Sequence, residues 1–368
     1  MEQGQKTKKD ERKEIMLLLD KYFRIMEETS NLVDPIILNY FEKSKGRICN
    51  NDEIYKKLYE AAIGRLGKPK MRSHIARLGY EICGGKDLIN FLPIAASMDL
   101  LEFSYYCCDK IFDYPGYYQN RQNVQDKIII SHILISLAYD LIGESIEKLK
   151  LNEQQTHYIL NTVSSFIKDI YEGFFIENHN NEPSMDVYER RTYAYNYWEH
   201  ILKIGGIAAG GSNERINALS NFGENIGIAY MVTNDISDII KDFEDIKNGR
   251  YTIINILFLE KASKNEKELF KKAFGNQKAQ KNDLESIAKI MVEREIIKES
   301  QIYASKFIEK ALPYLQLFDN SLEKKMLAVA TRAVYRNQWY RSLNELYGYK
   351  RAVSACGLEL AGINDLRI

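Results

Sequence analysis

Apolar residues recur along most of the chain at intervals of three and four positions, the spacing that puts side chains on one face of an α-helix. Alternating apolar and polar runs, which are typical of strands, are nearly absent, and proline occurs only six times in 368 residues. The pattern therefore predicts an all-α protein. Helices are expected at residues 15–28, 33–44, 51–66, 72–84, 91–112, 124–149, 153–176 and 215–247, with further charged helices from 265 onward.

No shift in composition and no internal repeat marks a domain boundary. A single large helical domain is expected over residues 15–368, preceded by a flexible tail at residues 1–14. The polar stretch at 177–184 is predicted to be a loop. With 45% hydrophobic residues, the chain can bury a core of this size.

Charge, cysteine content and apolar runs limit the partners and the compartment that we expect for this protein. The chain carries 51 basic and 51 acidic residues, so no overall field attracts nucleic acid or an anionic membrane. Five cysteines without the paired spacing of a zinc site indicate reduced thiols in a cytoplasmic protein. The charged start lacks the apolar core of a signal peptide. The apolar run at 127–140 is too short to span a bilayer and is expected to be a buried core helix.

Asn234, Asp238 and Asp242 recur at i, i+4 and i+8, so on one helix their oxygens would form a ladder along one face. Mg²⁺ favours oxygen ligands and is usually held by one or two carboxylates together with the phosphates of a substrate. Lys241 lies beside the ladder and could meet the same phosphate. A solvated acidic face is the alternative, but isoleucines interleaved with the ladder favour a partly buried helix.

A further pair of carboxylates, Asp109 and Asp113, has the same spacing on another apolar helix. Two such helices facing each other would hold a cluster of divalent ions within a bundle whose core binds a small molecule. Taken alone, this pair is explained equally well as a charge pair at a helix end. The two motifs together predict a metal-dependent site.

In these motifs the chain resembles the class I trans-isoprenyl diphosphate synthases and the terpene synthases that share their fold. Residues 109–113 are similar to the first DDxxD motif of the family. Residues 234–238, followed by 245–254, are similar to the later DDxxD motif and the run that follows it. Residues 67–72 are similar to the GGKxxRP segment, with one residue more. The resemblance covers roughly residues 67–257 and implies one large α-helical bundle of the class I terpenoid synthase type.

The resemblance also implies an Mg²⁺-dependent enzyme that acts on an allylic isoprenyl diphosphate, with three ions held together with that substrate. The catalytic metal ligands would be Asp109, Asp113, Asn234, Asp238 and Asp242. The diphosphate would be bound by Arg72, Arg121, Arg190, Arg191, Lys241 and Arg250. Phe103, Tyr105 and Tyr106, a turn or so before the first motif, are candidates for a pocket floor that sets chain length. Homodimerisation is the family habit, and the apolar helix at 128–141 could supply an interface.

Departures from the elongating members decide which reaction we expect. Ungapped extension places Glu102 on the histidine that helps those enzymes to hold isopentenyl diphosphate, and a carboxylate there is electrostatically unfavourable. Terpene synthases carry an Asn-Asp-x-x-Ser-x-x-Lys-Glu run with a diphosphate-sensing arginine upstream. Residues 234, 238, 241 and 242 fall at those spacings, and Arg190 and Arg191 lie at about the right distance. We therefore expect a terpene synthase that cyclises or quenches a carbocation.

Three alternatives stay open. The first is a chain-elongating prenyltransferase that uses isopentenyl diphosphate. Another is an enzyme like those of bacteria that prenylate a peptide pheromone, suggested by the short link between the later aspartate-rich motif and the Gly-Arg-x-Thr run. The last is a catalytically inactive subunit that supports a partner in a heteromeric prenyl synthase. Lys110, Glu102 and Asn120 motivate the inactive subunit, and the five retained metal ligands argue against it.

Overall fold

The computed structural model describes residues 8–43, 45–48, 50–113, 120–180 and 182–333. Over these ranges the chain is helical and contains no strand, which confirms the all-α prediction. The helices are α1 (Lys8–Lys43), α2 (Lys45–Ile48), α3 (Asp52–Ile63), α4 (Met71–Ile82), α5 (Leu88–Asp113), α6 (Arg121–Leu149), α7 (Glu153–His179), α8 (Met185–Ala194), α9 (Tyr197–Ala208), α10 (Asn213–Lys241), α11 (Glu244–Lys247), α12 (Ile253–Lys261), α13 (Lys264–Ala273), α14 (Lys281–Glu293), α15 (Ile296–Ala311), the 3₁₀ helix η2 (Leu312–Leu317) and α16 (Leu322–Ala333).

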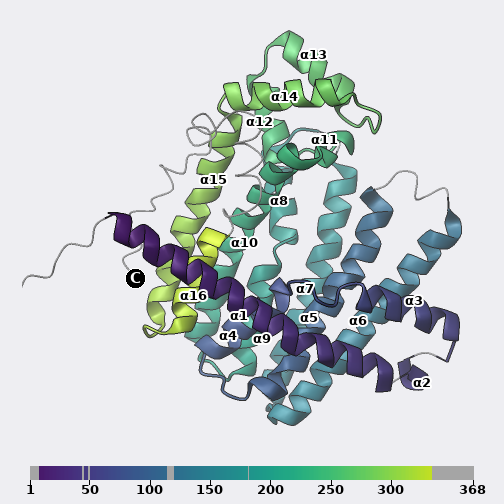
Figure 1. The fold of residues 1–368 in the computed structure, drawn as a ribbon, viewed down its shortest axis with the longest axis vertical. Helices are drawn as coiled ribbons and strands as arrows, with labels where there is room; N and C mark the ends of the chain where they lie inside the picture. The colour runs from purple at the N-terminus through teal and green to yellow at the C-terminus, as the bar shows by residue number, and fades with distance from the viewer. Residues whose placement is uncertain (1–7, 44, 49, 114–119, 181, 334–368) are drawn as a thin grey trace, which may run out of the picture.

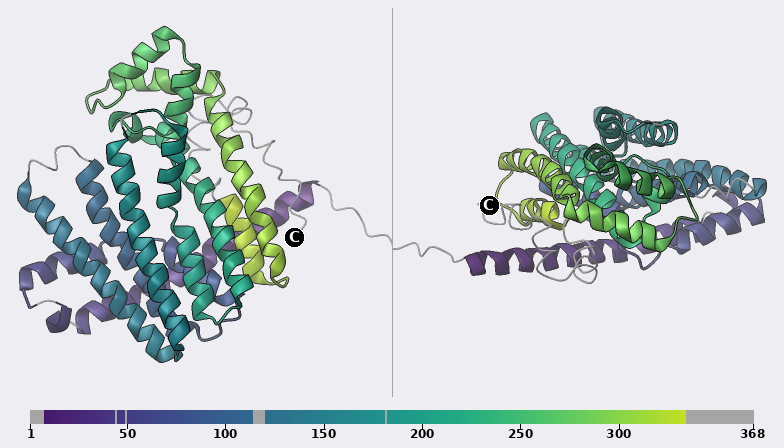
Figure 2. Two further views of the ribbon diagram at one scale, coloured as in Figure 1. Left: turned by 180° about the vertical axis from the view of Figure 1, so that it is seen from behind. Right: turned by 90° about the horizontal axis from the view of Figure 1, so that it is seen from above.

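The long helices run side by side as a bundle, and α13 and α14 form a lobe at one end of it (Figure 1). Helix α5 packs along α6 and α4, α4 packs on α9, and α10 packs between α9 and α15. Helix α1 crosses the outside of this bundle rather than entering it (Figure 2). The N-terminal end of α4 carries Arg72, the C-terminal half of α5 carries Asp109, and the C-terminal end of α10 carries Asn234 and Asp238.

Two glycines let α4 and α9 approach closely. A Cβ atom at Gly79 of α4 would lie 2.5 Å from the carbonyl oxygen of Leu202, and one at Gly205 of α9 would meet the backbone of α4. Only glycine fits such a crossing without moving a helix. The close approach brings Arg72, at the start of α4, against Tyr197, at the start of α9.

Helix α1 differs from the prediction because it is continuous. The sequence predicted a break at residues 29–32 and a loose tail up to residue 14, but the helix begins at Lys8 and passes through Pro35. Thr29 and Ser30 are buried, and their hydroxyls donate to the carbonyls of Ile25 and Met26 one turn earlier. Polar side chains that bond back to their own helix do not interrupt it. Residues 1–7 of the expected tail lie outside the described residues.

Helix α6 also differs from its prediction. It runs for 29 residues and, by length and composition alone, is long and apolar enough to cross a membrane. The most apolar window of α6 is 44% buried within the bundle, and core helices of soluble proteins pass the same test. Ile128 and Ile129 on its surface are 43% and 45% exposed, so α6 is a half-buried helix rather than a fully buried one.

Candidate active site

The first group of carboxylates lies where α10 ends. The sequence predicted one helix over 215–247, but α10 stops at Lys241, and Phe243 adopts a left-handed conformation with φ of 59°. Such a conformation is uncommon for a bulky residue and marks a strained turn. Asp238 stabilises the turn, because its two carboxylate oxygens accept hydrogen bonds from the backbone N–H groups of Glu244 and Asp245, each at 3.0 Å.

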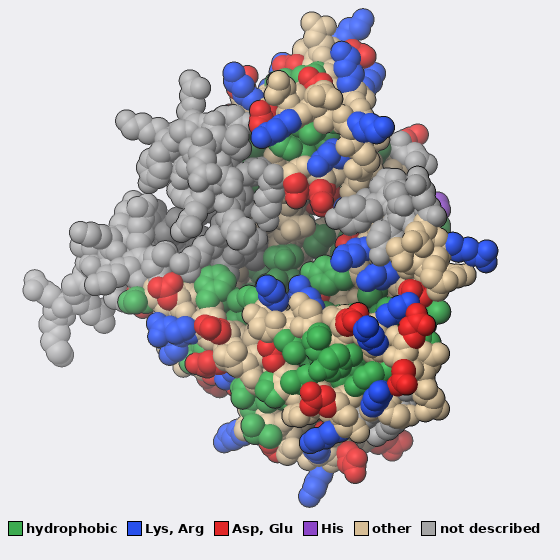
Figure 3. Space-filling view, turned by 45° about the vertical axis from the view of Figure 1, so that its right-hand side comes forward, with side chains coloured by type: hydrophobic (Ala, Val, Ile, Leu, Met, Phe, Trp, Pro, Cys, Tyr) green, Lys and Arg blue, Asp and Glu red, His purple; other side chains and the backbone are tan. Residues whose placement is uncertain are grey.

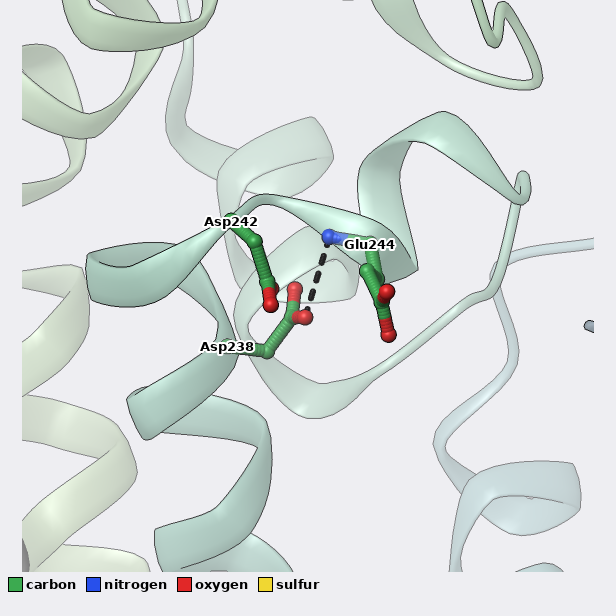
Figure 4. A group of neighbouring side chains, drawn as sticks. All are labelled: Asp238, Asp242 and Glu244. Carbon is green, nitrogen blue, oxygen red and sulfur yellow. Dashed lines mark hydrogen bonds between the residues drawn. The ribbon is translucent and has the colours of Figure 1, made fainter.

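The turn brings three carboxylates together. Asp238, Asp242 and Glu244 point toward one another, and each offers an oxygen within 4.8 Å of the others (Figure 4). Burial raises the pKa of Asp238 to about 8, and the Asp242 carboxyl next to it adds to the rise. Three acidic groups this close, two of them half-buried, repel each other unless a cation compensates them. Their oxygen atoms are the ligands that a hard divalent ion prefers, so the residues fit such an ion.

Another carboxylate faces this cluster from the end of α5. Burial raises the pKa of Asp109, and the positive charge of Arg250 opposes that rise. The charge of Asp109 in turn contributes to the raised pKa of Glu244, after burial and Asp242. The acidic ends of α5 and α10 therefore lie close enough for their charges to interact. The side chain of Asp113, one turn further along α5, lies outside what the structure describes.

Arginines and acidic groups form a buried network behind these carboxylates. Arg191 of α8 lies 2.9 Å from Glu177 and 3.4 Å from Asp235, measured between guanidinium nitrogen and carboxylate oxygen. Arg250 lies 3.6 Å from Glu177 and 3.4 Å from Asp245. The two arginines thus share Glu177, which links α8 to the segment after α11.

Two tyrosines complete the network. The Tyr195 hydroxyl donates a hydrogen bond of 2.8 Å to Glu177, and the Tyr188 hydroxyl donates one of 2.8 Å to Asp235. Glu177 and Asp235 are thus each contacted by an arginine and a tyrosine. Arg191 is 5% exposed and is engaged on both sides by protein carboxylates. This arrangement makes Arg191 a residue that positions its neighbours.

Glu102 of α5 forms a buried ion pair with Arg72 of α4. The guanidinium of Arg72 also lies 4.2 Å from the centre of the Tyr197 ring, a cation–π contact. A further arginine, Arg65, lies 3.6 Å from the same Glu102 oxygen. Burial would raise the pKa of Glu102, but the charges of Arg72 and Arg65 outweigh it and lower the pKa overall. Glu102 is therefore held as a carboxylate, and it neutralises Arg72.

The structure brings some predicted residues together and separates others. Asp238 and Asp242 lie together at the end of α10, and the charge of Asp109 interacts with those of Glu244 and Arg250. Asn234 is exposed one turn before Asp238 on α10. Arg121 is exposed at the start of α6, and Arg190 is exposed and pairs with Asp186 at 3.2 Å. The side chain of Lys241 lies outside the described part of the chain. The site assignments of all these residues stay predictions.

Sequence reasoning missed two members of the site. Glu244 does not share a helical face with Asp238, and it joins the cluster only because the chain turns at Phe243. Glu177 was assigned to a loop, but α7 extends to His179 and carries it inward. Of the three expected pocket-floor residues, Tyr105 is buried against Phe166 and Tyr171.

The molecular surface is hollowed between the lobe and the rest of the molecule (Figure 3). Hydrophobic side chains line this hollow, acidic side chains lie along its upper edge, and Lys and Arg side chains lie along its lower edge. A hollow of this kind suits a substrate with an apolar chain and an anionic head group.

The sequence profile of the polyprenyl synthetase family matches residues 52–291. The chain belongs to that family. It is a prenyltransferase-type enzyme of isoprenoid biosynthesis, as its relatives indicate. The first of these, geranylgeranyl diphosphate synthase from Sulfolobus acidocaldarius, is 26% identical over 80% of this chain and 89% of its own length. The short chain isoprenyl diphosphate synthase of Methanocaldococcus jannaschii is 25% identical over 71% of this chain and 83% of its own length.

Solved structures agree on the fold. Geranylgeranyl pyrophosphate synthetase from Pyrococcus horikoshii superposes with a TM-score of 0.74 at 20% identity, over 87% of this chain and 99% of its own. Geranylgeranyl pyrophosphate synthase from Corynebacterium glutamicum, crystallised with isoprenyl diphosphate and magnesium, superposes with a TM-score of 0.73 at 17% identity. That superposition covers 85% of this chain and 99% of the other. The bundle is therefore the isoprenyl diphosphate synthase fold, as the sequence resemblance implied.

Proposed function

We propose that the protein is a chain-elongating trans-isoprenyl diphosphate synthase, which joins an allylic isoprenyl diphosphate to isopentenyl diphosphate. The sequence alone favoured a terpene synthase. The relatives that match most of the chain are named geranylgeranyl or short chain isoprenyl diphosphate synthases, and these names support the elongating alternative. The structural observation that supports the proposal is the carboxylate cluster at the end of α10, whose charge interacts with that of Asp109 of α5 beside Arg250.

Mg²⁺ is the cofactor that this donor set fits. Asp109 from α5 would hold it on one side, and Asp238, Asp242 and Glu244 on the other. Asp113 and Asn234 complete the ligand set that the sequence predicted, and three ions remain the number we propose. When bound, Mg²⁺ stabilises the negative charge that develops on a departing diphosphate.

The protein's own residues prepare this site. Arg250, partly exposed beside Asp109, offers a cation to the diphosphate, and Glu177 and Asp245 hold its guanidinium in place. Arg191 holds Glu177 in place, and Glu177 in turn holds Arg250. Arg191 therefore acts on the diphosphate only through Arg250. The Asp238 hydrogen bonds fix the turn that carries Asp242 and Glu244. Preorganised charges of this kind lower the cost of ordering the site during the reaction.

A terpene synthase is the other candidate, and the Glu102–Arg72 pair favours it. In elongating members of the resembled family, the arginine of the GGKxxRP segment holds isopentenyl diphosphate. Here that arginine already carries an internal carboxylate. A further diphosphate must displace Glu102 or bind beside it against its charge. We therefore propose elongation with weak binding of isopentenyl diphosphate.

Release of inorganic diphosphate tests the proposal. Purified protein is incubated with Mg²⁺ and geranyl, farnesyl or geranylgeranyl diphosphate, with and without isopentenyl diphosphate. Elongation predicts release only when both substrates are present. Release from the allylic substrate alone would indicate the terpene synthase. No release under either condition would indicate either an inactive subunit or an enzyme that needs a peptide acceptor. Homodimerisation stays a prediction, which sedimentation velocity checks.

A further inference from the structure

Two arginines approach the same oxygen of Glu102. Arg72 of α4 makes the closer contact, and a guanidinium nitrogen of Arg65 lies 3.6 Å from the same Oε1 atom. The Tyr106 hydroxyl donates a hydrogen bond to this carboxylate as well. A separation of 3.6 Å is just too long for a hydrogen bond. Arg72 is therefore the primary partner of Glu102, and Arg65 is a secondary partner close at hand.

The surroundings of Arg65 leave it free to bind a carboxylate more closely. Its guanidinium carbon lies 5.6 and 5.2 Å from the ring centres of Phe103 and Tyr106, and these contacts hold the group next to α5. Its Nε atom is buried and has no hydrogen-bond partner among the described residues. A guanidinium carries five N–H donors, so Arg65 has donors to spare for Glu102.

Arg72 has a support that does not depend on Glu102. Its guanidinium lies 4.2 Å from the centre of the Tyr197 ring, so this contact would keep the group in place after the carboxylate had moved away. Glu102 itself is buried, and a buried carboxylate without a cation is expensive. Glu102 can therefore leave Arg72 only if another cation receives it. Among the described residues, Arg65 is the cation already beside it.

We propose that Glu102 changes partner when isopentenyl diphosphate binds. It leaves Arg72 and pairs with Arg65, and Arg72 then takes the diphosphate. This inference rests on the proposed function, because only elongation brings a second diphosphate to Arg72. Each arginine has one anion after the exchange, so no charge is left uncompensated. Arg65 is a positioning residue in this scheme, since it holds the displaced carboxylate and not the substrate.

A double-mutant cycle tests the exchange. The dissociation constant of isopentenyl diphosphate is measured by calorimetry on the full-length protein in EDTA, where the carboxylate cluster repels a diphosphate for want of a cation. Arg65→Met should raise this constant about tenfold, because Glu102 then has no second partner. The same substitution in a Glu102→Gln background should change it by less than about twofold, because no charge has to move. Arg65→Lys keeps the charge and should restore most of the affinity.

Lys57→Met is the matched control. Lys57 lies on α3, shortly before Arg65, and pairs with Asp126 of α6 at 2.7 Å. Its loss removes a cation from the same region without touching Glu102, so the dissociation constant should stay unchanged. Arg65→Gln replaces Arg65→Met if circular dichroism shows that the methionine variant does not fold.

An equal rise in both backgrounds would overturn the exchange, because Arg65 would then bind the diphosphate directly. No effect of Arg65→Met in the wild-type background would overturn it as well, as would an equal effect of Lys57→Met or no binding by wild type. Turnover separates this inference from the proposed function. If the cycle holds but no longer prenyl diphosphate forms, elongation fails and the exchange stands. If elongation occurs, Arg65→Met should raise the KM for isopentenyl diphosphate and leave kcat and the allylic KM within about twofold.

Discussion

Glu102 on α5 holds Arg72 on α4 in a buried ion pair, so the arginine that we propose for a diphosphate already has an anion of its own. Removing one partner of a buried pair leaves the other charge uncompensated. Loss of either partner should therefore destabilise the bundle, and the intact pair reduces the positive charge available to a further substrate.

Neutralising Glu102 should improve the use of isopentenyl diphosphate. Glu102→Gln keeps the shape of the side chain and removes its charge, so Arg72 becomes available to the diphosphate. We expect the KM for isopentenyl diphosphate to fall by about tenfold at saturating allylic substrate. Glu81→Gln is the control, because Glu81 also pairs with an arginine, Arg77, at 2.9 Å. An unchanged or higher KM in Glu102→Gln would show that the pair does not limit substrate binding.

The neighbouring arginines Arg190 and Arg191 should behave differently on truncation. Arg191→Ala leaves Glu177 and Asp235 buried without their cation, which should lower the free energy of unfolding by about 3–5 kcal/mol. Arg190→Ala removes an exposed pair with Asp186 and should cost less than about 0.5 kcal/mol. Urea denaturation measures both. If Arg191→Ala abolished activity at unchanged stability, it would instead be the direct diphosphate sensor that the terpene synthase pattern suggests.

Asp109→Asn should remove most activity while the fold is kept. Loss of a residue that merely orients a metal ligand costs roughly 10–100-fold, so loss of a ligand should cost at least about 100-fold. Thermal unfolding in EDTA should match wild type, because the role of this carboxylate arises only with metal and substrate bound. Asp186→Asn, on the exposed surface of α8, is the control and should retain full activity. Normal turnover by Asp109→Asn would exclude Asp109 from the metal ligands.

Asp99 should make stability depend on pH. Burial raises its pKa to about 7, and the charge of Glu102 adds to the rise. The folded state therefore binds this proton more tightly than the unfolded chain, in which an aspartate has a pKa of about 3.9. The stabilisation is complete below about pH 4 and is lost as pH rises through about 7. Asp99→Asn should gain stability relative to wild type as pH rises from about 4 to 7, measured by urea denaturation. A constant difference across that range would contradict the assignment.

Periodicity predicted the fold well where helices bury apolar stripes, and it failed where polar residues are buried. The prediction placed a break at residues 29–32 of α1, yet the hydroxyls of Thr29 and Ser30 bond to carbonyls one turn earlier and the helix stays intact. Glu177 belongs to a polar stretch typical of a loop, but two arginines and a tyrosine draw it into the bundle. Contacts with distant segments place Glu177 inside the bundle, and burial against the bundle keeps α1 continuous. The spacing of residues along one helix cannot reveal either kind of contact.

The carboxylate cluster could be anticipated in part. The spacing of Asp238 and Asp242 indicated a cluster, and the structure brings the two together. The ladder itself was only partly right, because α10 ends at Lys241 and the third carboxylate comes from Glu244. The left-handed Phe243 makes that turn, and nothing in the sequence pattern marks a phenylalanine as a helix terminator.

Mass analysis of the products is the most direct test of the proposed reaction. The purified protein is incubated with Mg²⁺, an allylic diphosphate and isopentenyl diphosphate labelled with ¹³C, and both diphosphates and extractable hydrocarbons are analysed. Chain elongation predicts a prenyl diphosphate that is one or more five-carbon units longer and carries the label. An unlabelled hydrocarbon or alcohol, formed equally well without isopentenyl diphosphate, would contradict elongation and identify a terpene synthase.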